Sequence, residues 1–133
     1  MSDADEPPIV YVVEMTNGFF ADLDDGWEHF RFHASEAIAD EWRESIIRAV
    51  WQIVDNPLGY PLPLEHAHFK HPVRRLLHQR TKTSATYRVL FCLEEPVARE
   101  DGTQATSVVV FAAIHASARP LSARKVRALE RRN

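Results

Sequence analysis

The stretch His66–Glu95, HAHFKHPVRRLLHQRTKTSATYRVLFCLEE, decides the fold of this 133-residue chain. A polar hairpin joins two apolar-rich strands, which contain Val73, Leu76 and Leu77, and Tyr87, Val89, Leu90 and Phe91. The first 28 residues hold six Lys/Arg and four His, and no Asp or Glu. Cations gathered on a sheet repel one another unless an anionic partner binds, such as a phosphate backbone or an acidic protein segment. A solvated strand face guarded by Lys and Arg is the alternative interpretation.

The composition outside this stretch is that of one ordinary globular domain, with 45% hydrophobic and 26% charged residues. We expect residues 1–8 to form a disordered tail and residues 9–133 a single domain. Cys92 is the only cysteine, so internal disulfides and cysteine-based zinc sites are excluded. The N-terminus MSDADEPP lacks signal-peptide features, and no apolar run reaches the ~20 residues that span a membrane. These features predict a cytoplasmic protein with no membrane partner.

The charges divide sharply between the two halves of the chain. Residues 1–65 hold 14 Asp/Glu against three Lys/Arg, a net charge of −11. Residues 66–133 hold five Asp/Glu against 13 Lys/Arg, a net charge of +8. This asymmetry indicates a basic functional face on an acidic body, or two halves that attract each other in the fold.

The first half of the chain predicts a strand followed by helices. Residues 9–15 are β-branched and aromatic, which predicts a strand buried on both faces at its start. Thr16 or Asn17 can cap a short helix, although Asn17-Gly18 is also a hairpin signal. Asp25-Gly26 is expected to end that helix, and residues 27–33 fit helix and strand equally. Residues 35–54 form the clearest helix, with Ser35 as N-cap and Asn56-Pro57 beyond its end.

The second half adds three strands and a helix. Residues 95–106 predict a hairpin loop, residues 107–114 a strand at the centre of the sheet, and residues 121–132 a basic helix. The expected fold is α+β. It has a small, mainly antiparallel sheet of about four strands, one long and one short helix packed on one face, and a C-terminal helix.

This pattern resembles the RelE/ParE superfamily of type II toxin–antitoxin toxins over roughly residues 9–125. The residues that carry the resemblance are the helix ending IVDNP, the basic strand VRRLL, the hairpin into YRVLF, and the strand VVVFAAIH followed by Arg119. The resemblance implies an antitoxin partner and one of two activities. RelE-like members cut mRNA on the ribosome without a metal or cofactor, whereas ParE-like members inhibit DNA gyrase.

Carried over from the ribonuclease branch, the resemblance nominates Arg74 or Arg75, Arg88, His115 and Arg119. Metal-independent RNA cleavage needs a base, an acid and cations around the phosphate. Arg88, Arg75 and Arg119 suit the cationic role, and His115 suits the base or acid. His78, on the neighbouring strand, is a second candidate for proton transfer. The lysines that some RelE-like members place on the first basic strand are arginines here, and a guanidinium stays protonated.

The remaining cations of the basic stretch, Lys70, Arg74, Arg80 and Lys82, are expected to bind RNA or the acidic antitoxin. Each nominated residue also has a structural interpretation. Arg88 can form a sheet-edge ion pair with Glu14 or an acidic N-terminal residue, and His115 can be a hydrogen-bonded residue at a strand end. His66, His68 and His71 have metal-compatible spacing, but the loop offers no clear carboxylate partner, so we predict no metal site. A gyrase inhibitor and a non-toxic module that holds an acidic peptide remain the alternatives to a ribonuclease.

Overall fold

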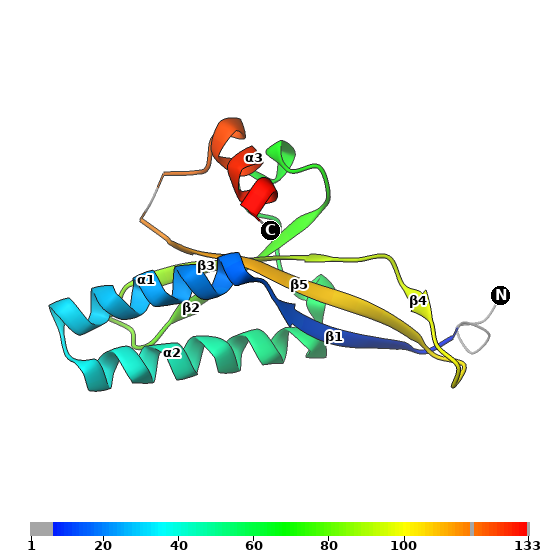
Figure 1. The fold of residues 1–133 in the computed structure, drawn as a ribbon, viewed down its shortest axis with the longest axis horizontal. Helices are drawn as coiled ribbons and strands as arrows, with labels where there is room; N and C mark the ends of the chain where they lie inside the picture. Colours follow the sequence, from blue (N-terminus) through cyan, green and yellow to red (C-terminus); the bar gives the residue numbers. More distant parts are fainter. Residues whose placement is uncertain (1–6, 118, 133) are drawn as a thin grey trace.

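One mixed sheet with helices on both faces forms this protein (Figure 1). The computed structural model describes residues 7–117 and 119–132, so most of the expected tail at 1–8 lies outside the described residues. The elements are β1 (Ile9–Met15), α1 (Asn17–His33), α2 (Glu36–Trp51), the 3₁₀ turns Gln52–Asp55, Pro57–Gly59 and His66–His68, β2 (Val73–Gln79), β3 (Thr86–Leu93), β4 (Val97–Ala98), β5 (Gln104–His115) and α3 (Ala123–Arg132). The predicted α+β class and C-terminal helix are confirmed.

The sheet has the order β1-β5-β3-β2. β5 lies between β1 and β3, which confirms its predicted central position. The pairs β2–β3, β3–β5 and β4–β5 are antiparallel, whereas β1 runs parallel to β5, so the sheet is mixed. A parallel pair requires a long crossover connection, and the chain from α1 to β4 supplies it.

Helices α1 and α2 form a hairpin whose starts were correctly predicted. The Thr16 and Ser35 hydroxyls accept hydrogen bonds from the amides of Phe19 and Ile38, each at 3.1 Å, as N-cap residues do. The break predicted at Asp25-Gly26 is wrong, because α1 continues to His33. A Cβ on Gly26 would lie 2.3 Å from Cη2 of Trp42, so the glycine admits the buried Trp42 ring of α2.

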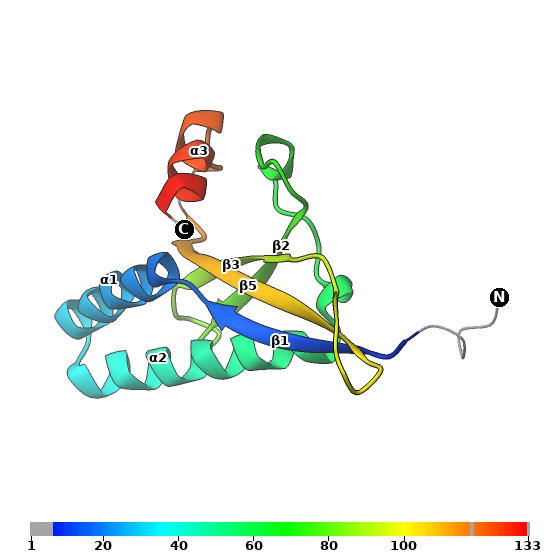
Figure 2. The same cartoon turned by 45° about the vertical axis from the view of Figure 1, so that its right-hand side comes forward.

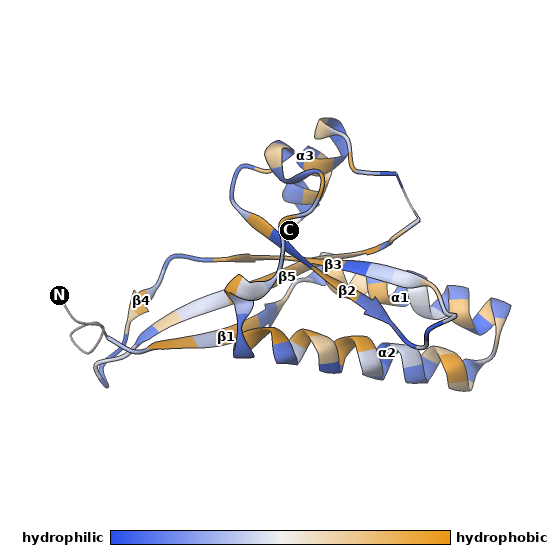
Figure 3. Ribbon diagram, turned by 180° about the vertical axis from the view of Figure 1, so that it is seen from behind, coloured by the Kyte–Doolittle hydropathy of each residue, from blue (hydrophilic) through white to orange (hydrophobic). Residues whose placement is uncertain are grey.

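The sheet has two faces that are covered differently (Figures 1 and 2). We call the side under α1 and α2 the helix face and the opposite side the α3 face. Apolar residues recur in bands along α2 (Figure 3), and its buried residues join the large core on the helix face. That core contains Phe19, Leu23, Phe30, Trp42, Ile46, Val50, Tyr87, Val89, Phe91, Val108 and Val110. A smaller cluster on the α3 face contains Val73, Leu90, Phe111 and Ala112.

Strand β1 departs from its predicted burial. It is the outermost strand of the sheet, and its start is exposed rather than buried on both faces. The apolar sequence alone favours a central strand, but β1 is covered only from Tyr11 onward and only on the helix face.

Candidate functional site

Strand alternation distributes the basic residues of β2 and β3 between the two faces. Tyr87, Val89 and Phe91 of β3 join the helix-face core, so Arg88 and Leu90 point to the α3 face. Arg75 lies opposite Leu90 and shares its face. Of the two arginines nominated on the first basic strand, Arg75 therefore shares a face with Arg88, and Arg74 does not.

Arg88 forms a buried ion pair with Glu65, through its Nη1 and the Oε1 of the carboxylate. The two residues are 7% and 2% exposed, respectively. The other carboxylate oxygen, Oε2, accepts a hydrogen bond from the Leu121 amide at 2.8 Å. Glu65 therefore connects β3 to the loop that precedes β2 and to the residues that precede α3.

The electrostatics of this pair follow from its burial. Burial raises the pKa of Glu65, but the hydrogen bonds from Arg88 and the Leu121 amide, together with the Arg88 charge, outweigh it and hold the pKa below its ordinary value. Nη2 of Arg88 is also buried and has no hydrogen-bond partner. Glu14, considered as a partner from the sequence, instead accepts a hydrogen bond from the Ser107 hydroxyl at 3.2 Å.

His115 lies on the helix face, away from Arg88. It is opposite Tyr87 in the β3–β5 register, and the two rings are 5.3 Å apart. Its Nδ1 is 3.1 Å from the Ser117 amide nitrogen, which donates to it, and 2.6 Å from the Ser117 hydroxyl. The structure therefore does not bring the nominated base and the nominated phosphate-binding arginine together.

Helix α1 places two more histidines, His29 and His33, near His115 of β5. The His29 ring lies 6.3 Å from that of His115 and 4.5 Å from that of His33. Burial, and then the charges of His33 and His115, lower the pKa of His29. Asp22 and Asp25 line the same shallow cavity of about 390 Å³. Asp22 is paired with Arg132 of α3 at 2.7 Å, and the exposed carboxylate of Asp25 disfavours a phosphate at this position, because like charges repel.

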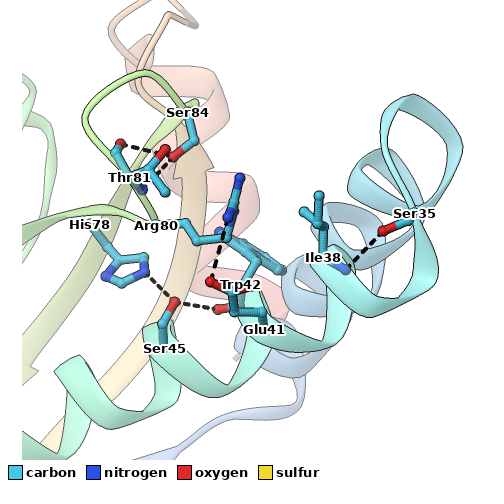
Figure 4. Close-up of polar contacts among 9 residues, drawn as sticks. All are labelled: Ser35, Ile38, Glu41, Trp42, Ser45, His78, Arg80, Thr81 and Ser84. Carbon is cyan, nitrogen blue, oxygen red and sulfur yellow. Dashed lines mark hydrogen bonds and ion pairs between the residues drawn. The ribbon is translucent and has the colours of Figure 1, made fainter.

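Three other nominated residues make contacts on the helix face of the sheet. They are His78, Arg74 and Arg80. Nε2 of His78 is 2.9 Å from the Ser45 hydroxyl of α2, and Arg80 pairs with Glu41 at 3.5 Å (Figure 4). Burial lowers the pKa of His78, which disfavours its charged form. Arg74 donates to the Tyr60 carbonyl at 2.7 Å. These contacts tie β2 to α2 and to the loop, which is a structural role.

The remaining nominated cations, Lys70, Lys82 and Arg119, are exposed. Sequence reasoning missed two features beside them. The first is Glu65, whose signal is its position as the last acid before the acid-free stretch 66–93. The second is that the predicted basic C-terminal helix lies over the same face of the sheet as Arg88. The exposed basic residues of α3 are Arg124, Lys125, Arg127, Arg131 and Arg132.

A cavity of about 370 Å³ lies on the α3 face, beside α3. Its lining includes Phe69, Val73, Val109 and Phe111, so it is mainly apolar. Cys92 also lines it, and burial, with the Glu94 charge, raises the pKa of this thiol. The higher pKa keeps the thiol protonated and poorly nucleophilic.

Within residues 7–117 and 119–132, no three His, Cys, Asp or Glu side chains are arranged to hold a metal ion. His66, His68 and His71 accordingly do not form such a group. Over the same residues, no helix combines the length and apolar character needed to cross a membrane. No family model and no curated protein sequence matches this chain.

Proposed function

We propose that this chain is the toxin of a type II toxin–antitoxin system of the RelE/ParE type, and that it acts by binding its target rather than by cutting RNA. The sequence resemblance supports the family. The choice of activity rests on one observation, which is that Arg88 is neutralised by Glu65 of the same chain.

Ribonuclease chemistry would need Arg88 free to hold a phosphate and a proton-transfer group beside it. Glu65 is buried against this guanidinium, and an RNA phosphate would have to displace it. His115 lies across the sheet beside Asp22 and Asp25. His78 is hydrogen-bonded to Ser45, and burial lowers its pKa. Binding requires none of these groups to be available.

The α3 face suits an acidic protein partner. Arg75 lies on this face, and the exposed side of α3 adds Arg124, Lys125 and Arg127. Complementary charge speeds association and selects partners. An antitoxin segment with acidic side chains would neutralise these cations, and a ParE-like target such as DNA gyrase is the corresponding cellular target.

An mRNA endoribonuclease acting on the ribosome is the second candidate. Its support is the exposure of Arg119 and of the basic side chains of α3, since a polyanion favours such a surface. In that case Arg75 and Arg119 would contact phosphates, and the base and acid would have to come from outside the nominated set.

The test is induced expression in growing cells, with primer extension on cellular mRNA. We expect growth arrest without new mRNA ends, and we expect His115→Ala to arrest growth as the wild type does. A combined Arg124→Glu and Arg127→Glu variant should relieve the arrest, whereas Arg99→Glu, an exposed control near β4, should not. Circular dichroism checks that each variant folds.

Other results would redirect the proposal. New mRNA ends that disappear in His115→Ala would establish the ribonuclease instead. No arrest at all in the absence of antitoxin would favour a non-toxic binding module.

A further inference from the structure

The outer edge of β1 is open. β1 is the last strand on its side of the sheet, and no other described strand pairs with that edge (Figure 2). Residues 9–13 read IVYVV and carry no charge. Ile9, Val10 and Val12 are 47%, 38% and 44% exposed. An apolar edge strand of this kind is a template for pairing with another strand.

The opposite edge of the sheet is guarded. The amide of Arg75 on β2 donates to the Pro61 carbonyl at 2.9 Å, so the loop occupies part of that edge. β2 also carries two arginines, and charges and covering loops protect sheet edges. β1 carries Glu14 as its one charged residue, and no backbone group of the described residues hydrogen-bonds to its outer edge. The contrast identifies β1 as the edge that is left open for pairing.

Two hydrogen bonds show which residues of β1 point their backbone N–H and C=O groups toward β5 and which point them toward the open edge. The Pro8 carbonyl accepts from the Gln104 amide at 2.8 Å, and the Thr16 amide donates to the Val110 carbonyl at 3.0 Å. Backbone groups alternate along a strand, so the even-numbered residues between them face β5. Ile9, Tyr11, Val13 and Met15 therefore present their N–H and C=O groups at the open edge.

We propose that β1 pairs with β1 of a second copy of this chain, antiparallel, about a two-fold axis at Val12. In this register Tyr11 lies opposite Val13, and Ile9 lies opposite Met15. All four residues have outward backbone groups, which is what hydrogen-bonded antiparallel pairs require. Val12 meets Val12 of the second copy at the axis, and the contact is the same on both copies, as two-fold symmetry demands.

Charge selects this arrangement over the parallel one. In the antiparallel register Glu14 lies opposite Val10, and the two Glu14 side chains are separated along the strands by about 13 Å. A parallel pair in register would place Glu14 against Glu14, and like charges directly opposite are destabilising. The antiparallel pair places no like charges opposite each other, so β1 is complementary to a second copy of itself in this register.

The test measures association by sedimentation equilibrium from micromolar to submillimolar concentration. The wild type should form dimers. Val12→Lys places two lysines opposite each other at the axis, and should weaken the dimer about tenfold through their repulsion and the lost apolar contact. An equimolar mixture of Val12→Lys and Val12→Glu should restore dimers, because opposite charges then meet at the axis.

The control is Val97→Lys, an exposed substitution on β4 that should leave association unchanged. Hydrogen exchange of the wild type provides a second measurement that needs no variant. The Tyr11 and Val13 amides should become protected as concentration rises. A wild type that stays monomeric at the highest concentration, or a Val12→Lys protein that dimerises as well as the wild type, would show the proposal to be wrong. The inference does not depend on the proposed toxin activity.

Discussion

The two faces of the sheet are built on different principles. On the helix face, α1 and α2 bury large apolar side chains such as Phe19, Trp42 and Ile46 against the sheet. On the α3 face the apolar cluster is small, and the buried Arg88–Glu65 pair joins β3 to the loop and to the start of α3. Dense apolar packing makes the helix face intolerant of buried polar groups. The α3 face combines its small apolar cluster with two ion pairs, Arg88–Glu65 and Arg132–Asp22.

This difference bears on function. A surface that binds a partner benefits from segments that can shift, and such segments have few buried apolar contacts. The α3 face comes nearer to this description than the helix face, because its apolar cluster is smaller and polar contacts of Glu65 and Arg132 supplement it. The helix face is the scaffold that keeps the strands in place.

The largest expected effect comes from breaking the connection on the α3 face. Arg88→Ala leaves Glu65 buried without its cation, and we expect a loss of about 3–5 kcal/mol in the free energy of unfolding. Urea denaturation measures it. Arg75→Ala removes a more exposed arginine from the same face and should change stability by no more than about 0.5 kcal/mol. Equal losses in the two variants would mean that the buried pair is not what holds this face.

A smaller effect is expected on the helix face. Gly26→Ala would press a methyl group against the buried Trp42 ring, and overpacking of this kind costs about 1–3 kcal/mol. Thermal and urea unfolding provide the measurement. Ala37→Gly, on the exposed side of the first turn of α2, is the control and should cost less than the ~1 kcal/mol of a glycine in a helix interior. A stabilised Gly26→Ala protein would show that the helices can move apart without penalty.

Local patterns in the sequence were sufficient to predict most of the elements. Ser35 with the helical spacing after it predicted α2, and the apolar run 107–114 predicted the central strand β5. Asp25-Gly26 has the composition of a turn, which led to the wrong prediction of a helix end. The glycine instead leaves room for the ring of Trp42, which lies on the neighbouring helix α2. This is a contact between two helices, and the residues next to Gly26 in the sequence do not indicate it.

The candidate site was less predictable than the fold. The sequence identified Arg88 as important, but its partner Glu65 is 23 residues away and joins it only through the path of the loop. The face of His115 depends on the register between β3 and β5, which shifts between Leu90 and Phe91. Because side chains alternate along a strand, a register shift of one residue moves a side chain to the other face. Spacing alone therefore could not place His115 and Arg88 relative to each other.

The smallest expected effect is on the pH dependence of the free energy of unfolding, to which His78 on the helix face and Glu65 on the α3 face contribute in different pH ranges. Burial lowers the pKa of His78 below the ordinary 6.5, so the unfolded chain binds a proton that the folded chain does not. The helix face should therefore lose stability as pH falls below about 6.5, through the folded pKa of His78. Glu65 also has a lowered pKa, so its contribution should be lost only as pH falls below the ordinary 4.5.

The measurement is the free energy of unfolding against pH, for the wild type and for His78→Gln. The amide of glutamine can still hydrogen-bond to Ser45 but does not titrate. The slope just below pH 6.5 should therefore shrink in His78→Gln, and the slope below pH 4.5 should remain. His29→Gln should reduce the upper slope less, because His29 lies on the exposed side of α1. If the slope just below pH 6.5 is unchanged in His78→Gln, then the imidazole of His78 is not kept neutral in the folded protein. A lower slope as steep in Arg88→Ala as in the wild type would mean that the pair with Arg88 does not lower the pKa of Glu65.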